Sequence, residues 1–215
     1  MNDRILFLKA CGDSIYGSDE KKRIILMDGE NSKIIEDKID WSHDFCFING
    51  DLFYTKDRKI YDKRGNMKTE LEYPIKIKFH ENSIYVLDQE KSAIFVFDND
   101  FKLIKTIGEF GYDKFEKQDE LFFHFPVDFD VSDGRVGVID TGNRRTVILK
   151  GDEKRIFKIV GKKMVFYDEN TALILFGDII YKIDLKDDNV YETEYEGIID
   201  FCINPDTKEL IVSRD

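Results

Sequence analysis

The chain has 215 residues, of which 42% are apolar and 13% aromatic, a composition that supports a sizeable core and excludes a disordered chain. Its 33 basic and 44 acidic side chains give a net charge of −11, which argues against a nucleic-acid partner because affinity for the phosphate backbone rests on Lys and Arg. The longest apolar runs, such as 172–176, are far shorter than the roughly 20 residues of a membrane helix, so we expect no membrane insertion. Three cysteines without close pairing are typical of a reducing compartment, so we expect a cytoplasmic protein.

One unit recurs along the chain: an alternating segment, a turn rich in Asn, Asp and Gly, an apolar run and then an Asp. In chain order the six copies begin at Ile5, His43, Ile75, Val127, Met164 and Ile199. They reach their closing residues at Asp19, Asp57, Asp88, Asp140, Asp178 and Asp215. The closing residues recur about every 39 residues, a period within the range of propeller blades.

Each complete copy is expected to form four short strands separated by turn residues. The strands are clearest in copy three, at 75–79, 84–87, 93–97 and 102–107, and in copy four, at 127–131, 135–139, 146–149 and 155–160. Copy six includes only two strands. The pattern predicts an all-β chain, a β-propeller of five four-stranded blades plus an incomplete two-stranded sixth blade, as a single domain over 1–215. A β-sandwich is the alternative, and strands of another chain could complete the sixth blade.

Copies three and four include a Gly-Phe-Gly turn at 108–111, Pro126 at a strand start, an Asp-Gly turn at 133–134 and Asp-x-x-Asn-x-Arg at 140–145. In the order and approximate spacing of these features, about residues 84–150 resemble NHL repeats. The other copies lack the Asn-Arg element. The resemblance implies a propeller, commonly six-bladed, with a binding or scaffold role. Some NHL relatives are peptide-amidating lyases and lactonases that hold metals around the central channel.

Alignment of the six first strands gives one position that is always apolar: Leu8, Phe45, Ile77, Phe129, Val165 and Phe201. Because side chains alternate along a strand, the flanking positions face the other way, and we expect them to line a solvated channel. The polar candidates among them are Lys9, Asp44, Cys46, Lys76, Lys78, Asp128, Asp130, Asp200 and Cys202. Their carboxylates could hold Ca²⁺, or the three lysines could neutralise them without a ligand.

No other residue pattern points to catalysis. The histidines, His43, His80 and His124, are expected on different faces of the blades, and we expect Cys46 and Cys202 to remain free thiols. The closing Asp residues are expected to accept backbone N–H groups in turns rather than to bind metal. We therefore predict no catalytic residues, no metal and no cofactor.

The connection between copies three and four, residues 108–125, is unusually long and aromatic. Its aromatic side chains either pack back onto the blades or form a docking surface for a partner. The candidate docking residues are Phe110, Tyr112, Phe115, Phe122 and Phe123.

Together these features favour a non-catalytic protein-interaction or scaffold propeller that belongs to a larger complex. Two alternatives stay open. One is a metal-dependent enzyme of the lactonase or lyase kind that uses the channel carboxylates, and the other is a sensor domain for a small ligand.

Overall fold

The structure is a computed structural model that describes residues 4–28, 31–37, 43–115 and 120–215. The chain divides into two compact units. The first unit comprises residues 1–40 and 165–215, and the second comprises residues 41–164. The boundary between them falls within one strand, β19 (Lys163–Asp168).

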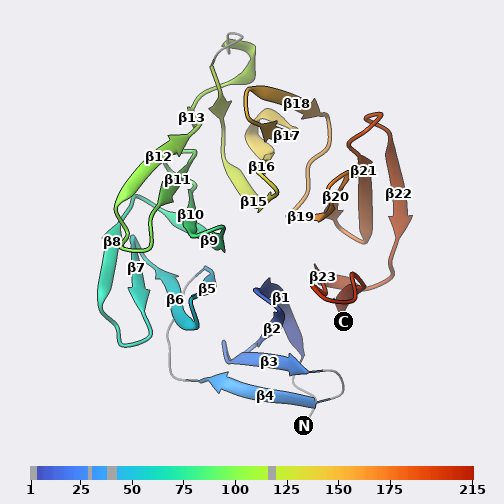
Figure 1. The fold of residues 1–215 in the computed structure, drawn as a ribbon. Coiled ribbons are helices and arrows are strands. Elements are labelled where there is room, and N and C mark those ends of the chain that lie inside the picture. Colours follow the sequence, from blue (N-terminus) through green and yellow to red (C-terminus); the bar gives the residue numbers. More distant parts are fainter. Residues whose placement is uncertain (1–3, 29–30, 38–42, 116–119) are drawn as a thin grey trace. The chain divides into compact units, whose positions relative to one another are not determined.

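The second unit contains three antiparallel sheets of four strands, each with its strands in chain order (Figure 1). The first of them consists of β5 (Phe45–Ile48), β6 (Asp51–Lys56), β7 (Lys59–Asp62) and β8 (Met67–Glu70). The next consists of β9 (Pro74–His80), β10 (Ser83–Asp88), β11 (Ala93–Phe97) and β12 (Leu103–Ile107). The third consists of β15 (Pro126–Ser132), β16 (Arg135–Asp140), β17 (Arg145–Lys150) and β18 (Glu153–Phe157). The first strand β9 contacts both other first strands, β5 and β15.

Two short strands of the second unit, β13 (Glu109–Phe110) and β14 (Phe122–Phe123), form a parallel pair within the long connection. Between them lies a 3₁₀ turn, η1 (Asp113–Phe115), and a second, η2 (Thr141–Asn143), follows β16. Among the residues that the structure describes, there is no helix with the length and hydropathy that crossing a membrane requires.

The first unit contains two further four-stranded sheets and one sheet of two strands. One consists of β1 (Ile5–Cys11), β2 (Ser14–Asp19), β3 (Ile24–Asp28) and β4 (Asn31–Glu36). The other consists of β19, β20 (Thr171–Phe176), β21 (Ile179–Asp184) and β22 (Val190–Glu194). The two-stranded sheet is β23 (Ile198–Ile203) with β24 (Leu210–Arg214).

The described residues therefore form five four-stranded blades and a sixth blade of two strands, as the sequence predicts, and the fold is a β-propeller. Period-2 burial explains the assembly, because each blade has two apolar faces that must pack against neighbouring sheets. One such core joins the blades β9–β12 and β15–β18 through side chains that include Leu87, Ile94, Val138 and Phe129.

The predicted apolar position of the first strands is buried in blades one, two, three, four and six. In blade five the predicted register is wrong by one residue. Val165 is only half-buried, whereas Met164 is 2% exposed and Phe166 is 7% exposed. Apolar residues occupy 164, 165 and 166 in succession, so hydropathy alone did not distinguish the two faces of this strand.

The closing Asp has its expected structural role in blades one, three and four. Asp19, Asp88 and Asp140 end their second strands, and each is at most 3% exposed. Asp88 accepts the N–H groups of Glu72 and Tyr73 at 2.7 and 2.9 Å, which fixes the segment that leads into the blade's first strand.

Asp57 and Asp178 lie in the turns after their second strands, but unlike Asp19, Asp88 and Asp140 they are exposed, and Asp215 lies exposed beyond the end of β24. In blades two and six, strand pairing places Lys56 and Arg214 at the equivalent last position of the second strand. A neighbouring Asp in the sequence therefore does not occupy the same hydrogen-bonding position.

We predict that Asp19→Asn lowers the free energy of unfolding at pH 7 by about 2 kcal/mol. Burial disfavours the ionised carboxylate, but hydrogen bonds and the charge of Arg23, with the Lys21 N–H, outweigh it and hold the pKa of Asp19 below its ordinary value of 3.8. A lowered pKa stabilises the fold above the ordinary value, and this stabilisation is lost as the pH falls through the pKa of the folded state. Urea unfolding from pH 7 to pH 2.5 should therefore show a difference that shrinks at low pH. Asp13→Asn, at an exposed position of the same unit, is the control, and an unchanged difference at low pH would contradict the prediction.

Candidate functional site

The first strands of the blades carry buried carboxylates that bind the backbone of a neighbouring first strand. Asp44, next to β5, accepts the N–H of Ile77 on β9 at 2.9 Å. Asp128 on β15 accepts the N–H of Met164 at 2.7 Å. In the first unit, Asp200 on β23 accepts the N–H of Leu8 on β1, also at 2.7 Å.

These three hydrogen bonds have one physical cause. First strands of adjacent blades form no backbone ladder with each other. The N–H groups on the edge of each first strand that faces away from the second strand therefore need other acceptors. A carboxylate is the strongest side-chain acceptor available, and a buried N–H without a partner is costly. The predicted channel-lining residues Asp44, Asp128 and Asp200 are accordingly 1–6% exposed and hold the blades together.

Lysines of β9 pair with two of the carboxylates on β15. The ammonium of Lys76 lies 3.2 Å from Asp128, and Lys78 contacts Asp130. Burial raises the pKa of Asp128, and the charge of Lys76 and the Met164 N–H only partly oppose this effect. These pairs fit neutralisation by lysine rather than a calcium site. Lys9, the third predicted lysine, is half-buried on β1.

The other candidate ligands are dispersed. Cys46 and Cys202 are thiols outside any disulfide and at most 2% exposed, and Cys202 packs against Leu8 and Ile15. His43 contacts the ring of Tyr73, and His80 lies 3.6 Å from Glu81. No group of three or more His, Cys, Asp or Glu side chains in the described ranges is placed to hold a metal ion.

We predict that Asp128→Ala lowers the free energy of unfolding by about 3 kcal/mol, because the Met164 N–H loses its acceptor and Lys76 loses this partner in a buried site. Asp128→Asn keeps an oxygen acceptor and should cost less. Because the raised pKa disfavours the ionised form in the folded state, the wild type should gain stability relative to Asp128→Asn as the pH falls through the folded-state pKa toward 3.8. Thermal melts at pH 7 and pH 4.5 test both points, with the exposed Asp152→Ala as control. A wild-type melt for Asp128→Ala would refute the structural role.

The long connection presents a cluster of exposed aromatic side chains, which we call the aromatic cluster: Phe110, Tyr112, Phe115 and Phe125, gathered about His124. Their exposed fractions are 56%, 42%, 65% and 54%. The ring of His124 lies 4.4 Å from that of Tyr112, 4.8 Å from that of Phe125 and 5.5 Å from that of Phe110. Tyr112 also meets Phe115 edge to face at 6.4 Å.

A buried anchor beneath the aromatic cluster fixes the course of the connection. Phe123 is fully buried in the core between blades three and four, and Phe122 is half-buried, so neither offers the exposed docking side chain that we expected. Gly108 has a positive φ of 77°, and a Cβ there would collide with the Phe123 ring. The β13–β14 pairing and the bond from the Gly111 N–H to the Phe123 oxygen, at 2.9 Å, join the two arms of the connection.

The turn after β16 is hydrogen-bonded to the connection that carries the aromatic cluster. Asn143 donates to the Gly111 oxygen at 3.3 Å and accepts the Asp113 N–H at 3.2 Å. The N–H of Gly142 donates to the His124 oxygen at 2.7 Å, and any Cβ on Gly142 would collide with His124. His124 in turn donates its N–H to Asp140 at 2.7 Å. The Asn of the Asp-x-x-Asn-x-Arg motif therefore ties the connection to the blade.

Phe125 was missing from the predicted docking residues. It precedes Pro126 and has a positive φ of 49°, and its ring lies exposed beside His124. Alternation along an extended segment would place position 125 on the same side as the buried Phe123, so the sequence pattern alone did not separate the two, and the positive φ of Phe125 breaks that alternation.

Comparison with known proteins shows the fold and no more. No family model matches the chain, and no curated protein matches it significantly. Among solved structures, it is similar to Hsv2 of Kluyveromyces lactis, with 14% identity over 100% of this chain and 71% of that chain, at a TM-score of 0.62. A chain of a nidogen/laminin complex is 15% identical, with 89% of this chain and 80% of that chain covered and a TM-score of 0.63. A streptogramin B lyase is also 15% identical, covering 100% of this chain and 78% of that chain at a TM-score of 0.62. All three are β-propeller proteins.

Proposed function

We propose that this chain is a non-catalytic, NHL-like propeller that binds another protein through the aromatic cluster. The observation that carries the proposal is the exposure of four aromatic side chains on one braced connection. Exposed aromatic residues that gather in one patch are typical of protein interfaces, where they contribute much of the binding energy. We further propose that residues 1–215 act as a single domain in the cytoplasm, within a larger complex, and the net charge of −11 argues against nucleic acid.

The geometry of the aromatic cluster suits docking in two further ways. The cluster is held by backbone hydrogen bonds and by the buried Phe123, so little conformational entropy is lost when a partner binds. The ammonium of Lys114 lies 4.9 Å from the centre of the Phe115 ring and 5.7 Å from that of Tyr112. It adds a positive charge to an apolar patch on an acidic chain, a combination that favours a partner surface with apolar and acidic groups. The nidogen/laminin complex is an example of a propeller of this fold in a protein complex.

We predict that the triple substitution Phe110→Ser, Tyr112→Ser and Phe115→Ser weakens partner binding at least about tenfold and leaves the fold intact, because these side chains are largely exposed. A tagged protein would capture partners from the host, and calorimetry with the purified partner would compare wild type and variant. The matched control replaces Leu103 and Ile104 by Ser, which are 50% and 57% exposed on β12 of the same unit. Unchanged affinity with a normal melt would reject the docking role, and a large fall in melting temperature would show that the cluster packs onto the blades.

The alternative, a metal-dependent enzyme of the lactonase or lyase kind, draws on the likeness to a streptogramin B lyase. Against it, Asp128 and Asp130 pair with lysines, while Asp44 and Asp200 accept backbone N–H groups. A carboxylate engaged in this way is a poor calcium ligand.

We predict that the protein purified without chelator contains less than one equivalent of zinc or calcium per chain. Elemental analysis by inductively coupled plasma mass spectrometry measures this directly. A melting temperature that falls on addition of a chelator, or one equivalent of either metal, would favour the enzyme instead.

A further inference from the structure

The two-stranded blade has an unpaired edge. Within the described ranges, β24 pairs with β23 alone, whereas the second strand of every other blade pairs with a third strand. An edge strand presents backbone N–H and C=O groups that can pair with another strand.

The available backbone groups can be assigned to particular residues. The Asp215 N–H donates to the Gly197 oxygen, and the Asn204 N–H donates to the Glu209 oxygen, each at 2.9 Å. Backbone groups along a strand point alternately to its two sides, so odd-numbered residues from 209 to 215 face β23. Leu210, Val212 and Arg214 consequently direct their backbone N–H and C=O groups away from it.

This edge is recessed between two longer sheets of the same unit (Figure 1). On one side β1 contacts both β23 and β24, and Leu8 and Ile15 pack against Cys202 and Ile211. On the other side the blade β19–β22 packs against β23 and β24, where Val212 joins the core around Phe201. Both flanking sheets have two more strands, so the edge lies about 10 Å behind their outermost strands, given a strand spacing of about 4.8 Å.

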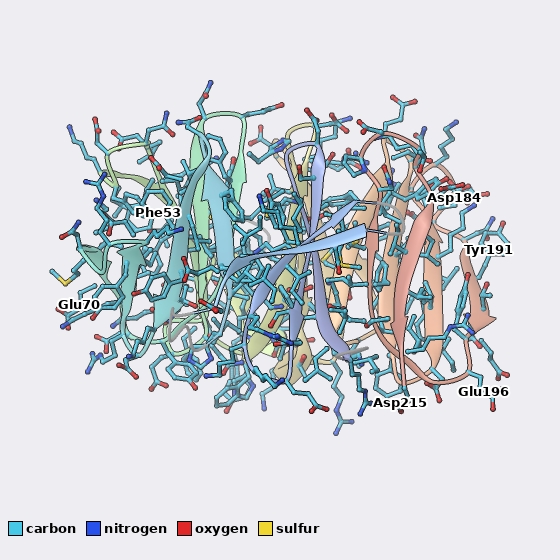
Figure 2. The ribbon with its side chains drawn as sticks, turned by 90° about the horizontal axis from the view of Figure 1, so that it is seen from below. Phe53, Glu70, Asp184, Tyr191, Glu196 and Asp215 are labelled. Atoms are coloured by element: carbon cyan, nitrogen blue, oxygen red, sulfur yellow. The ribbon has the colours of Figure 1, made fainter. Side chains whose placement is uncertain are left out.

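A hollow lies at the end of β24 next to the turn that joins it to β23. The hollow has a volume of about 740 Å³ and is lined by Tyr167 and residues 207–212. Leu210, Ile211 and Val212 on its wall are only half-buried. In Figure 2, Tyr191 lies on the outer strand of the neighbouring blade, β22, and it is 51% exposed. The space therefore combines an unpaired backbone edge with incompletely covered apolar side chains.

We propose that this recess binds a two-stranded β-hairpin of a partner protein, whose first strand pairs with β24 and has branched aliphatic side chains at alternate positions. The other blades provide the template, because each third strand has a branched aliphatic residue that is at most 3% exposed: Ile24, Ile60, Ile94, Val147 and Ile180. Backbone pairing supplies affinity, and the alternate side chains supply specificity by filling the space between the flanking blades. The proposal is independent of the aromatic cluster, which lies in the other unit.

A second copy of this chain does not fit as the occupant. Its own β24 is recessed in the same way, so the flanking sheets of the two copies collide before the two edges come within the roughly 4.8 Å that pairing requires. A hairpin has two strands and no flanking sheets, and its width matches the two strands by which the blade is shorter than its neighbours.

The probes for the test are two synthetic peptides with the sequences of residues 179–194 and 59–70, the third and fourth strands of two blades of this chain. Hydrogen exchange followed by NMR on the whole protein should show that the amides of Leu210, Val212 and Arg214 exchange fast when the protein is free. At least one peptide should bind with 1:1 stoichiometry and slow these three amides at least about tenfold, whereas Ile211 and Ser213 are slow with or without peptide.

Val212→Pro removes an outward N–H and should weaken binding at least about tenfold. Its matched control Val212→Ala loses side-chain packing but keeps the N–H, and Arg214→Pro repeats the test at an exposed side chain.

Three results would overturn the proposal. The first is fast exchange of the three amides with both peptides, each tested at 1 mM. The second is slow exchange of these amides in the free protein, whether sedimentation shows a monomer or a dimer. A dimer would identify a second copy as the occupant. The third is equal loss of peptide binding in Val212→Ala and Val212→Pro. Substitutions in the aromatic cluster should leave peptide binding unchanged, so failure of the edge and failure of the docking surface are distinguishable.

Discussion

The bond from a buried carboxylate to the backbone of a neighbouring first strand is the constraint on which the blades depend. Three times in the chain an Asp-Phe pair, at 44–45, 128–129 and 200–201, buries its phenylalanine and directs its carboxylate to another first strand. Adjacent blades pack by their apolar faces, which is not directional, so these hydrogen bonds fix how far one first strand slides along the next. In each of these residues one carboxylate oxygen is therefore engaged in a contact between first strands.

Fixed first strands leave the connections and the outer edges of the blades as places for variation. In the connection 108–125, one buried ring, Phe123, fills the core between two blades, and the neighbouring aromatic side chains remain exposed. Asn143, in the turn after β16, forms hydrogen bonds with the connection. The motif that resembles an NHL repeat therefore anchors the connection to the blade. These contacts fix the backbone beneath the exposed rings.

Much of the fold was predictable because strand signals are local. Alternation and Asn, Asp or Gly turns located the strands of blades three and four to within a few residues. The failures have physical causes. Three consecutive apolar residues at 164–166 concealed which face of β19 is buried, and an Asp one or two residues beyond a strand end resembled the Asp that ends the second strand in other blades. For the candidate site, the aromatic composition of the connection was visible, but which rings were buried was not.

The sequence by itself determined the all-β character, the number of blades, the short sixth blade and the acidic net charge, because periodicity, turn residues and charge are properties of the chain alone. Only the tertiary structure decided the roles of individual side chains. The Asp-Phe pairs resemble channel ligands until a neighbouring first strand places an N–H within 2.9 Å, and Phe123 differs from Phe125 only in which side of the connection meets the core. Each of these roles depends on contacts between residues distant in sequence, so no local pattern encodes them.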